Sequence, residues 1–413
     1  MMNNNNYGSS GNNFSPSEQT SGGYYNGTVQ NYSRPPQWNY QNTQNQQNQN
    51  IYAPGQGYNA NPNPQDYYMP PEPRMYAPVP PVAQYYYPPS PEQALMQEKQ
   101  NEKKIVRKLG NRTGWAVNVM LVSMTLIFTA LCAVFYSGII GSQSDNLSSL
   151  FNAIAAMLSM FLGGFILLAL THTKLSDAVT FKRTKSRKRC AAVFLVGLGA
   201  IPLCNLLSQL IANNLTLIGI ENKSYGESST TPEIDLFYIF IQVLCTAIVP
   251  AVSEEFLFRG AVMGALKPYG QGFAIVMSSV IFGLIHGNLG QIPFAIAGGM
   301  FFAYLAVYSG SLIPSIILHG LNNLLSVILD ITMCVYDESI TYAILIAYYA
   351  IFCVVAIVAF VMLAKRDKDI MQFERPESKI TDSQKSRAFI ASPGMIVFLV
   401  LITLETVSAY FSF

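Results

Sequence analysis

The chain has 413 residues, of which half are hydrophobic and only 12% are charged, with a formal net charge of +2. So little charge in a chain of this length is unusual for a water-soluble fold and typical of a protein that crosses a membrane several times. The net charge itself carries little information, because the distribution of charge along the chain is the signal. No nucleic-acid partner is expected.

The six cysteines are scattered, mostly within apolar runs, and no two of them form a CxxC pair. This spacing argues against a disulfide framework and against a metal site built from thiolates. We expect these side chains to act as small buried hydrophobic groups.

The first segment, residues 1–92, consists mainly of Asn, Gln, Tyr, Gly, Ser and Pro. It contains long monotonous runs, such as 41–50 and 80–91, and no apolar periodicity from which a core could form. We expect a disordered, low-complexity tail. The first 110 residues are polar, so no cleavable signal peptide is expected.

Long apolar runs follow the tail, and several of them are long enough to cross a bilayer. They cover residues 115–140, 147–170, 190–217, 234–266, 272–287, 292–308, 312–331, 342–364 and 395–411. The fold class that this predicts is all-α, a polytopic transmembrane helix bundle of about nine spans. The predicted parts after the tail are a basic juxtamembrane helix with the first two spans (93–189), a core (190–364), and a charged cytoplasmic segment with the final span (365–413).

The basic residues gather in three segments, 99–112, 174–189 and 365–387, whereas the loop at 221–232 is mainly acidic. Lys and Arg near the ends of spans are retained in the cytoplasm, so the basic segments are expected inside. Nine spans satisfy this placement with a cytoplasmic amino terminus. We therefore expect a multi-pass protein of the plasma membrane.

The fourth predicted span carries Ala251-Val-Ser-Glu-Glu-Phe-Leu-Phe-Arg259. A charged side chain near the bilayer centre costs roughly 2.5–3.5 kcal/mol, so three of them together indicate a function. In a helix, Glu255 and Arg259 stand four residues apart and can pair, whereas Glu254 is rotated by about 100° and faces elsewhere. Pro250, just before these residues, is expected to kink the helix.

Two of the three histidines also lie in apolar runs, in Phe282-Gly-Leu-Ile-His286 and in His319-Gly-Leu-Asn-Asn323. His319 and Asn323 share a helical face because they are four residues apart. At 1.5 Å per residue, Glu254 and His319 both lie within about 20 Å of the inner surface. A polar cavity in the inner half of the membrane is therefore geometrically consistent with the spacing.

Such a set of side chains supports hydrolysis of an amide. A glutamate and an imidazole can remove a proton from attacking water, and an imidazole and an amide can stabilise the oxyanion. The same Glu254, His286 and His319 could instead bind a divalent metal such as zinc, and spacing alone does not choose between these alternatives. No serine or cysteine is placed as a covalent nucleophile; Ser253 has no assigned base.

In order and on successive helices, these three motifs resemble those of the CPBP intramembrane proteases. That family includes CAAX prenyl endopeptidases of the Rce1 type and bacteriocin-processing or immunity (Abi) proteins, and the resemblance covers residues 190–364. It implies an endopeptidase that cleaves a peptide bond near the cytoplasmic membrane face, in CAAX-like C-terminal processing or in leader-peptide processing. It also implies roles for the site residues: Glu254 and His286 activate water, His319 and Asn323 stabilise the oxyanion, and Glu255 and Arg259 form a supporting ion pair. We favour a mechanism that requires no cofactor.

Two other classes of function are compatible with the sequence. One is a non-catalytic membrane scaffold or bacteriocin-immunity protein with the same fold. The other is a transporter or proton path that uses the buried acid and histidines as a relay. A relay should continue to both faces, and few candidate groups lie outward of these positions. The expected partners are a peptide or membrane-protein substrate and the lipid bilayer; the sequence predicts neither the substrate nor the oligomeric state.

Overall fold

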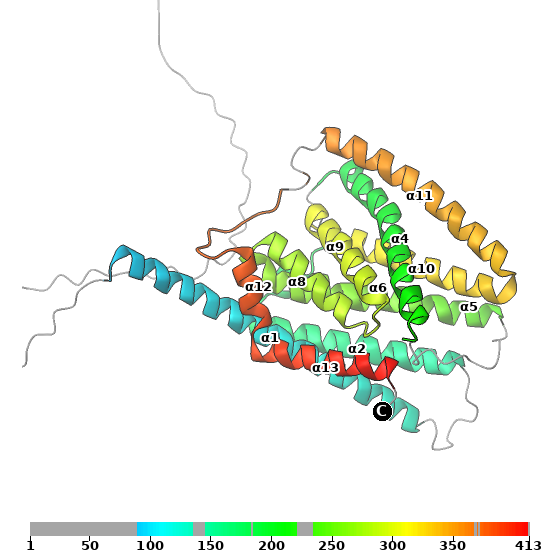
Figure 1. Cartoon of the computed structure of the whole chain (residues 1–413), viewed down its shortest axis with the longest axis horizontal. Coiled ribbons are helices and arrows are strands. Elements are labelled where there is room, and N and C mark those ends of the chain that lie inside the picture. The colour runs from blue at the N-terminus through cyan, green and yellow to red at the C-terminus, as the bar shows by residue number, and fades with distance from the viewer. Residues whose placement is uncertain are drawn as a thin grey trace, which may run out of the picture. The chain divides into compact units, whose positions relative to one another are not determined.

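The computed structural model describes residues 89–134, 145–182, 185–220, 234–366, 370 and 372–411. Within these ranges every regular element is a helix, which confirms the all-α prediction. The predicted disordered tail lies almost wholly outside the described residues, as do the acidic loop at 221–232 and the end of the first predicted span. The helices belong to one compact unit, Tyr85–Phe413 (Figure 1).

The helices follow the predicted apolar runs closely. Their bounds are α1 (Pro91–Val134), α2 (Asp145–Thr171), α3 (Leu175–Ala178), α4 (Arg187–Leu217), α5 (Leu236–Gln242), α6 (Val249–Glu255), α7 (Met263–Leu266), α8 (Gln271–Leu284), α9 (Gln291–Ser309), α10 (Ile313–Val335), α11 (Glu338–Arg366), α12 (Asp382–Ile390) and α13 (Pro393–Tyr410). Eight helical segments in the described ranges are long and apolar enough to cross a membrane. The remaining predicted span, 272–287, corresponds to α8, whose 14 residues extend about 21 Å.

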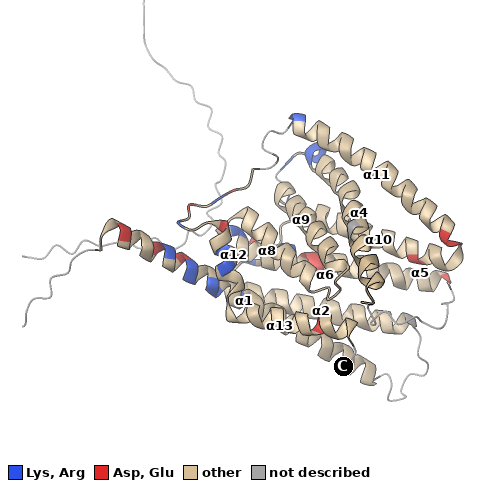
Figure 2. Ribbon diagram, viewed as in Figure 1, with Lys and Arg blue, Asp and Glu red and all other residues tan. Residues whose placement is uncertain are grey.

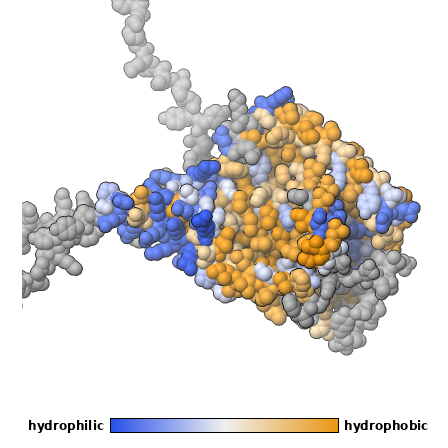
Figure 3. All heavy atoms as spheres, viewed as in Figure 1, coloured by the Kyte–Doolittle hydropathy of each residue, from blue (hydrophilic) through white to orange (hydrophobic). Residues whose placement is uncertain are grey.

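The surface of this unit is what a bilayer requires. Many large apolar side chains of α4, α11 and α13 are exposed, among them Leu210, Ile346 and Leu404. In Figure 3 the visible face of the bundle is largely hydrophobic, whereas polar residues gather on the free end of α1. Figure 2 shows charged residues at that end of α1 and on α12, while α6 carries acidic residues in the middle of the bundle. The chain is therefore built as a membrane protein.

The basic juxtamembrane helix and the first span form one continuous helix, α1. Its middle packs against the junction of α12 and α13, where three glycines allow the backbones to meet. A Cβ on Gly110 would lie 2.4 Å from the Phe389 carbonyl oxygen, and one on Gly114 would lie 2.2 Å from the Gly394 carbonyl carbon. Helices this close are fixed relative to each other, because only glycine leaves room at the contact.

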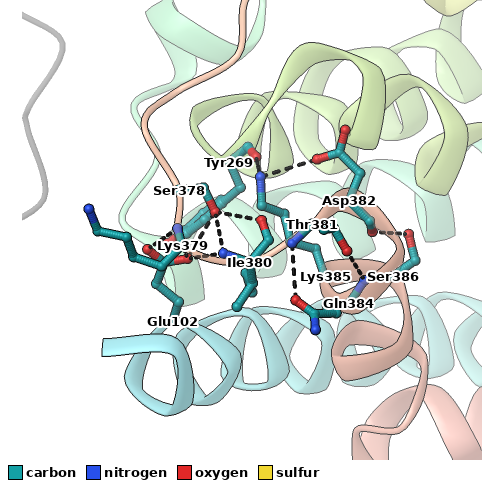
Figure 4. Close-up of polar contacts among 10 residues, drawn as sticks. All are labelled: Glu102, Tyr269, Ser378, Lys379, Ile380, Thr381, Asp382, Gln384, Lys385 and Ser386. Atoms are coloured by element: carbon teal, nitrogen blue, oxygen red, sulfur yellow. Dashed lines mark hydrogen bonds and ion pairs between the residues drawn. The ribbon is translucent and has the colours of Figure 1, made fainter. Parts of the chain in front are cut away.

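The segment between α11 and α13 is held across one end of the bundle (Figure 4). Glu102 of α1 accepts hydrogen bonds from the Ser378 hydroxyl at 2.8 Å and from the backbone N–H of Lys379 at 3.0 Å. On α12, the buried ammonium of Lys385 donates to the Tyr269 carbonyl at 2.8 Å and to Asp382 at 3.2 Å. These contacts tie α1, α12 and the end of the helix that carries the acidic motif to one another.

The fourth span, Leu236–Tyr269, is an uninterrupted run of helical turns in which α6 is flanked by two π-helical segments, η2 (Val243–Ile248) and η3 (Phe256–Val262). Pro250 lies in the first turn of α6, directly after η2. A wider π turn accommodates a proline, which has no N–H to donate to the preceding turn. The expected irregularity at Pro250 is therefore present, and π turns of this kind frequently occur at functional sites.

Candidate active site

Glu255 is the centre of a fully buried polar cluster. Its Oε1 lies 2.9 Å from Nη1 of Arg259, one helical turn further on, and both side chains have an exposed fraction of zero. Its Oε2 accepts a hydrogen bond of 2.5 Å from the Ser315 hydroxyl of α10. The pairing of Glu255 with Arg259 is the one that their spacing predicts.

The Arg259 guanidinium is enclosed by aromatic rings and backbone. Its Nη2 donates to the Gly299 carbonyl of α9 at 3.1 Å, and its Cζ lies 4.2 Å from the centroid of the Phe282 ring. A Cβ on Gly299 would lie 3.2 Å from that nitrogen, so glycine leaves the guanidinium its space. The ring and the carboxylate partly compensate the burial of this cation, while its Nε and Nη1 have no hydrogen-bond partner among the described residues.

His319 connects the two acids of α6. Its Nδ1 lies 3.0 Å from Oε1 of Glu255, and its ring stacks on Phe302 with 4.6 Å between centroids. Because Glu255 is an acceptor held by a cation and a hydroxyl, Nδ1 of His319 is the donor in this contact. Its other nitrogen, Nε2, lies 3.7 Å from Oε2 of Glu254, too far for a direct hydrogen bond.

Glu254 has the opposite surroundings from those of its neighbour. Its Oε2 is buried and has no hydrogen-bond partner among the described residues, although the side chain retains 14% exposure. A buried carboxylate oxygen without a partner is rare and indicates a place for water or a ligand. Glu254 is thus the acid that faces open space, as the 100° rotation between the two acids predicts.

His286 lies just beyond the end of α8, in the turn that leads to α9. Its Nδ1 is 2.8 Å from the Phe282 carbonyl oxygen. A carbonyl only accepts, so Nδ1–H is the donor, and Nε2 of a neutral His286 keeps a free lone pair. The backbone of α8 therefore sets the tautomer that a proton acceptor needs.

Four of the six predicted site residues, Glu254, His286, His319 and Asn323, line one cavity of about 390 Å³, whereas Glu255 and Arg259 do not. Its polar lining includes Glu254, His286, Gln291, His319, Asn322, Asn323 and Ser326, together with Asn152 of α2 and Thr246 of η2. The convergence that the sequence predicted is therefore present in the structure. The catalytic role of each residue stays a prediction.

A second cavity of about 280 Å³ adjoins the first and shares Glu254, His286, Thr246 and Pro250 with it. Its remaining wall comes from α1 and α2 and is mostly apolar, with Met120, Met124, Ala153, Ala156 and Met160. Glu254 and His286 therefore stand between a polar chamber and an apolar one. Sequence reasoning did not anticipate that the first two spans contribute to the site.

Asn322 also lies at the site, although adjacent residues of an ideal helix such as Asn322 and Asn323 point about 100° apart. In the structure it lines the same cavity, and its Nδ2 donates to the Asn323 side chain at 3.3 Å. Ser315 and Phe302 belong to no local motif of the sequence. They reach the site through the packing of α9 and α10, where Ser315 contacts Glu255 and Phe302 stacks on His319.

Glu254, His286 and His319 are the candidate ligands for a divalent metal at this site. Among the described residues, no three His, Cys, Asp or Glu side chains form a group that could hold an ion. Nδ1 of His319 is directed at Glu255, and Nδ1 of His286 is directed at a backbone carbonyl. Metal-binding histidines make the same contacts with the nitrogen that does not bind the metal, so these contacts fit both the zinc and the metal-free alternative, and no step below is routed through a metal.

A buried acid, two imidazoles and two amides around a cavity inside an apolar helical bundle define a membrane protein with a hydrolase-like site. Residues 236–325 match the family model described as "Type II CAAX prenyl endopeptidase Rce1-like". The matched range contains all six predicted site residues. It is narrower than the 190–364 expected from the motifs.

One curated relative supports the same assignment. The chain is 30% identical over 129 residues to "Putative membrane peptidase YdiL" of Bacillus subtilis (strain 168), an alignment that covers 30% of this chain. The chain spans about half the length of that relative, 52%. No solved structure matches the chain significantly. These matches confirm the resemblance of residues 236–325 to the Rce1-like CAAX prenyl endopeptidases of the CPBP family.

Proposed function

We propose that the protein is an intramembrane endopeptidase that hydrolyses a peptide bond with a water activated by Glu254. One observation carries the proposal: Glu254 presents an unpartnered buried carboxylate oxygen at the junction of two cavities, 3.7 Å from His319. A water in that gap would bridge the acid and the imidazole. An extended peptide needs space on both sides of its scissile bond, and the two cavities provide it.

The proposed reaction begins when Glu254 takes a proton from the water as its oxygen attacks the scissile carbonyl carbon. Nε2 of His286 faces the reaction as a second acceptor, because Nδ1 is committed to the Phe282 carbonyl. The proton held by Glu254 then passes to the leaving nitrogen as the C–N bond breaks. The products are a carboxylic acid and an amine, which become a carboxylate and an ammonium by transfer of one proton, so atoms and charge balance without a covalent intermediate.

The oxyanion of the tetrahedral intermediate requires donors, and the Asn323 amide and His319 Nε2 lie on the same cavity wall. Since Nδ1 of His319 donates to Glu255, Nε2 can donate only when the ring carries two protons. In this role Glu255 does more than pair with Arg259. It also sets the orientation of the His319 ring, as second-shell carboxylates do in other catalytic sites.

The proposed substrate is a peptide or the tail of a membrane protein, processed at a CAAX-like C-terminus or at a leader sequence. The proposed location is the plasma membrane. The amino terminus and residues 372–392 would lie on its cytoplasmic side, because basic residues gather in and next to these segments. The mechanism that we propose requires no metal, and the chelator experiment below tests this.

The test is a cleavage assay on the full chain in detergent, with CAAX-like and leader peptides, comparing the wild type with Glu254→Ala and His286→Ala. The proposal expects cleavage by the wild type and loss in both variants. Cleavage by neither the wild type nor the variants would favour the non-catalytic scaffold or immunity protein. A chelator separates the mechanisms: loss of activity that added metal restores would overturn the metal-free one.

A further inference from the structure

The segment that carries His286 is short, non-helical and deep. The helix α8 ends at Leu284 and α9 begins at Gln291, so residues 285–290 form the turn. With only about 21 Å of helix before it, this turn falls short of a 30 Å hydrocarbon core and lies at membrane depth. Lipid offers no partners for backbone groups there, so they depend on the protein or on water in a cavity.

The last helix, α13, supplies those partners through one hydroxyl group. The Tyr410 hydroxyl donates to Oδ1 of Asn288 at 3.0 Å and accepts from the backbone N–H of Leu289 at 3.1 Å. The same Asn288 oxygen accepts from the N–H of Gly290 at 2.9 Å. On the other side, the Ser208 hydroxyl of α4 donates to the Gly290 carbonyl.

The turn is also conformationally specific. Gly287, which follows His286, has φ of +60°, a conformation that side chains rarely adopt. A Cβ at Gly287 would lie 3.9 Å from the hydroxyl of Thr406, one turn before Tyr410 on α13. The outer end of α13 is thus packed directly against the residue that follows the histidine.

The inner end of α13 is fixed as well, about 24 Å away at 1.5 Å per residue. The backbone N–H of Gly394 donates to Oδ1 of Asn111 at 2.8 Å, and its carbonyl accepts from Nδ2 of Asn118 at 3.1 Å. With Gly114 leaving no room between α1 and α13, the last helix cannot slide along its axis. Tyr410 therefore contacts the turn from a helix whose other end is held by α1.

From these contacts we infer that Tyr410 is a positioning residue for His286: its hydroxyl locks the 285–290 turn and so fixes the imidazole against Glu254. The inference rests on the proposed function for its effect on catalysis, although the anchoring itself does not. It assigns a role to α13, which lies outside the residues that match the family model. A misplacement of about 1 Å can cost on the order of a hundredfold in rate.

The test substitutes Tyr410→Phe in the full-length protein, which keeps the ring and removes only the hydroxyl. Hydrogen exchange of peptides that cover 285–291 is measured together with kcat and KM for a cleaved peptide. The matched control is Tyr348→Phe, whose hydroxyl donates to the Leu198 carbonyl at 3.3 Å in the contact between α11 and α4. The inference expects faster exchange in 285–291 and a kcat lower by about tenfold or more, with KM within about twofold, for Tyr410→Phe alone.

A second variant gives an independent criterion. Because Tyr410 acts through Asn288, the double variant Tyr410→Phe/Asn288→Ala should lose little more kcat than Asn288→Ala alone, whereas independent effects would multiply. Unchanged exchange in Tyr410→Phe, or unchanged kcat, would overturn the inference. If the wild type cleaves no peptide, the proposed function fails, and exchange alone decides whether Tyr410 anchors the turn.

Discussion

Glu254 and Glu255 are neighbours in sequence and opposites in structure. The Glu255 carboxylate contacts a guanidinium, a hydroxyl and an imidazole, and no part of the side chain is exposed. Glu254 has a buried oxygen that no described residue satisfies, beside two cavities. A carboxylate held by three partners is suited to maintaining a structure, whereas one with a free oxygen is suited to binding water. Two adjacent residues, rotated by about 100° on one helix, can therefore have different roles.

The largest expected effect is on the rate of cleavage, when Glu254 is replaced. Glu254→Gln should lower kcat by about 10²–10⁴, the usual contribution of a positioned general base. The midpoint of thermal unfolding should stay near that of the wild type, because no hydrogen bond to the free oxygen is lost. Purified variant and wild type are compared for peptide cleavage and for thermal unfolding in the same detergent.

The next largest effect is on the free energy of unfolding, when Glu255 is replaced. Glu255→Gln leaves the Arg259 guanidinium buried without a counter-charge, which should cost about 3–5 kcal/mol of unfolding free energy. Replacing both partners, as Glu255→Leu with Arg259→Met, should restore most of it, since a well-packed apolar pair removes both buried charges. Equal losses in the single and the double variants would show that the pair is not the source of stability.

A smaller effect on kcat is expected at the two amides of the cavity, Asn322 and Asn323. Asn323→Ala should reduce kcat by about 10²–10³ if its amide is an oxyanion donor. Asn322→Ala serves as the control, because Asn322 lines the same cavity but donates to Asn323. A larger loss in Asn322→Ala than in Asn323→Ala would reverse the assignment of the two amides.

The smallest expected effect concerns the apolar chamber between α1 and α2. Ala153→Leu adds a branched side chain to its wall and should raise KM by about tenfold for peptides with bulky apolar residues. Peptides with small residues should be affected less, and kcat should change little, since Ala153 lies on α2, away from the reacting groups. Kinetics with a peptide pair that differs in one apolar residue measures the effect.

Much of this arrangement could be predicted from the sequence. Apolar runs, several of them long enough to cross a bilayer, predicted the helices. A spacing of four residues predicted the pairing of Glu255 with Arg259, and the rotation between adjacent residues predicted that Glu254 points elsewhere. Three motifs on three apolar runs predicted their convergence. In each case the information is local, because helical geometry alone determines which side chains share a face.

The rest depended on how helices pack. Ser315 and Phe302 complete the Glu255 cluster, and neither belongs to a recognisable motif. His319 also lies between both acids, which its motif does not predict, and its role at the oxyanion stays a prediction. The predicted span 272–287 ends at Leu284, because Gly287 adopts a positive φ and the turn is held by Tyr410, more than a hundred residues away. Such contacts join segments that are distant in the sequence, so no local pattern reports them.

The most direct test of the central claim is single-turnover cleavage by Glu254→Gln at saturating peptide, with the peptide dissociation constant measured in the same sample. The account predicts a dissociation constant like that of the wild type and a cleavage rate lower by about 10²–10⁴. Cleavage within tenfold of the wild-type rate would contradict the assignment of Glu254 as the residue that activates water.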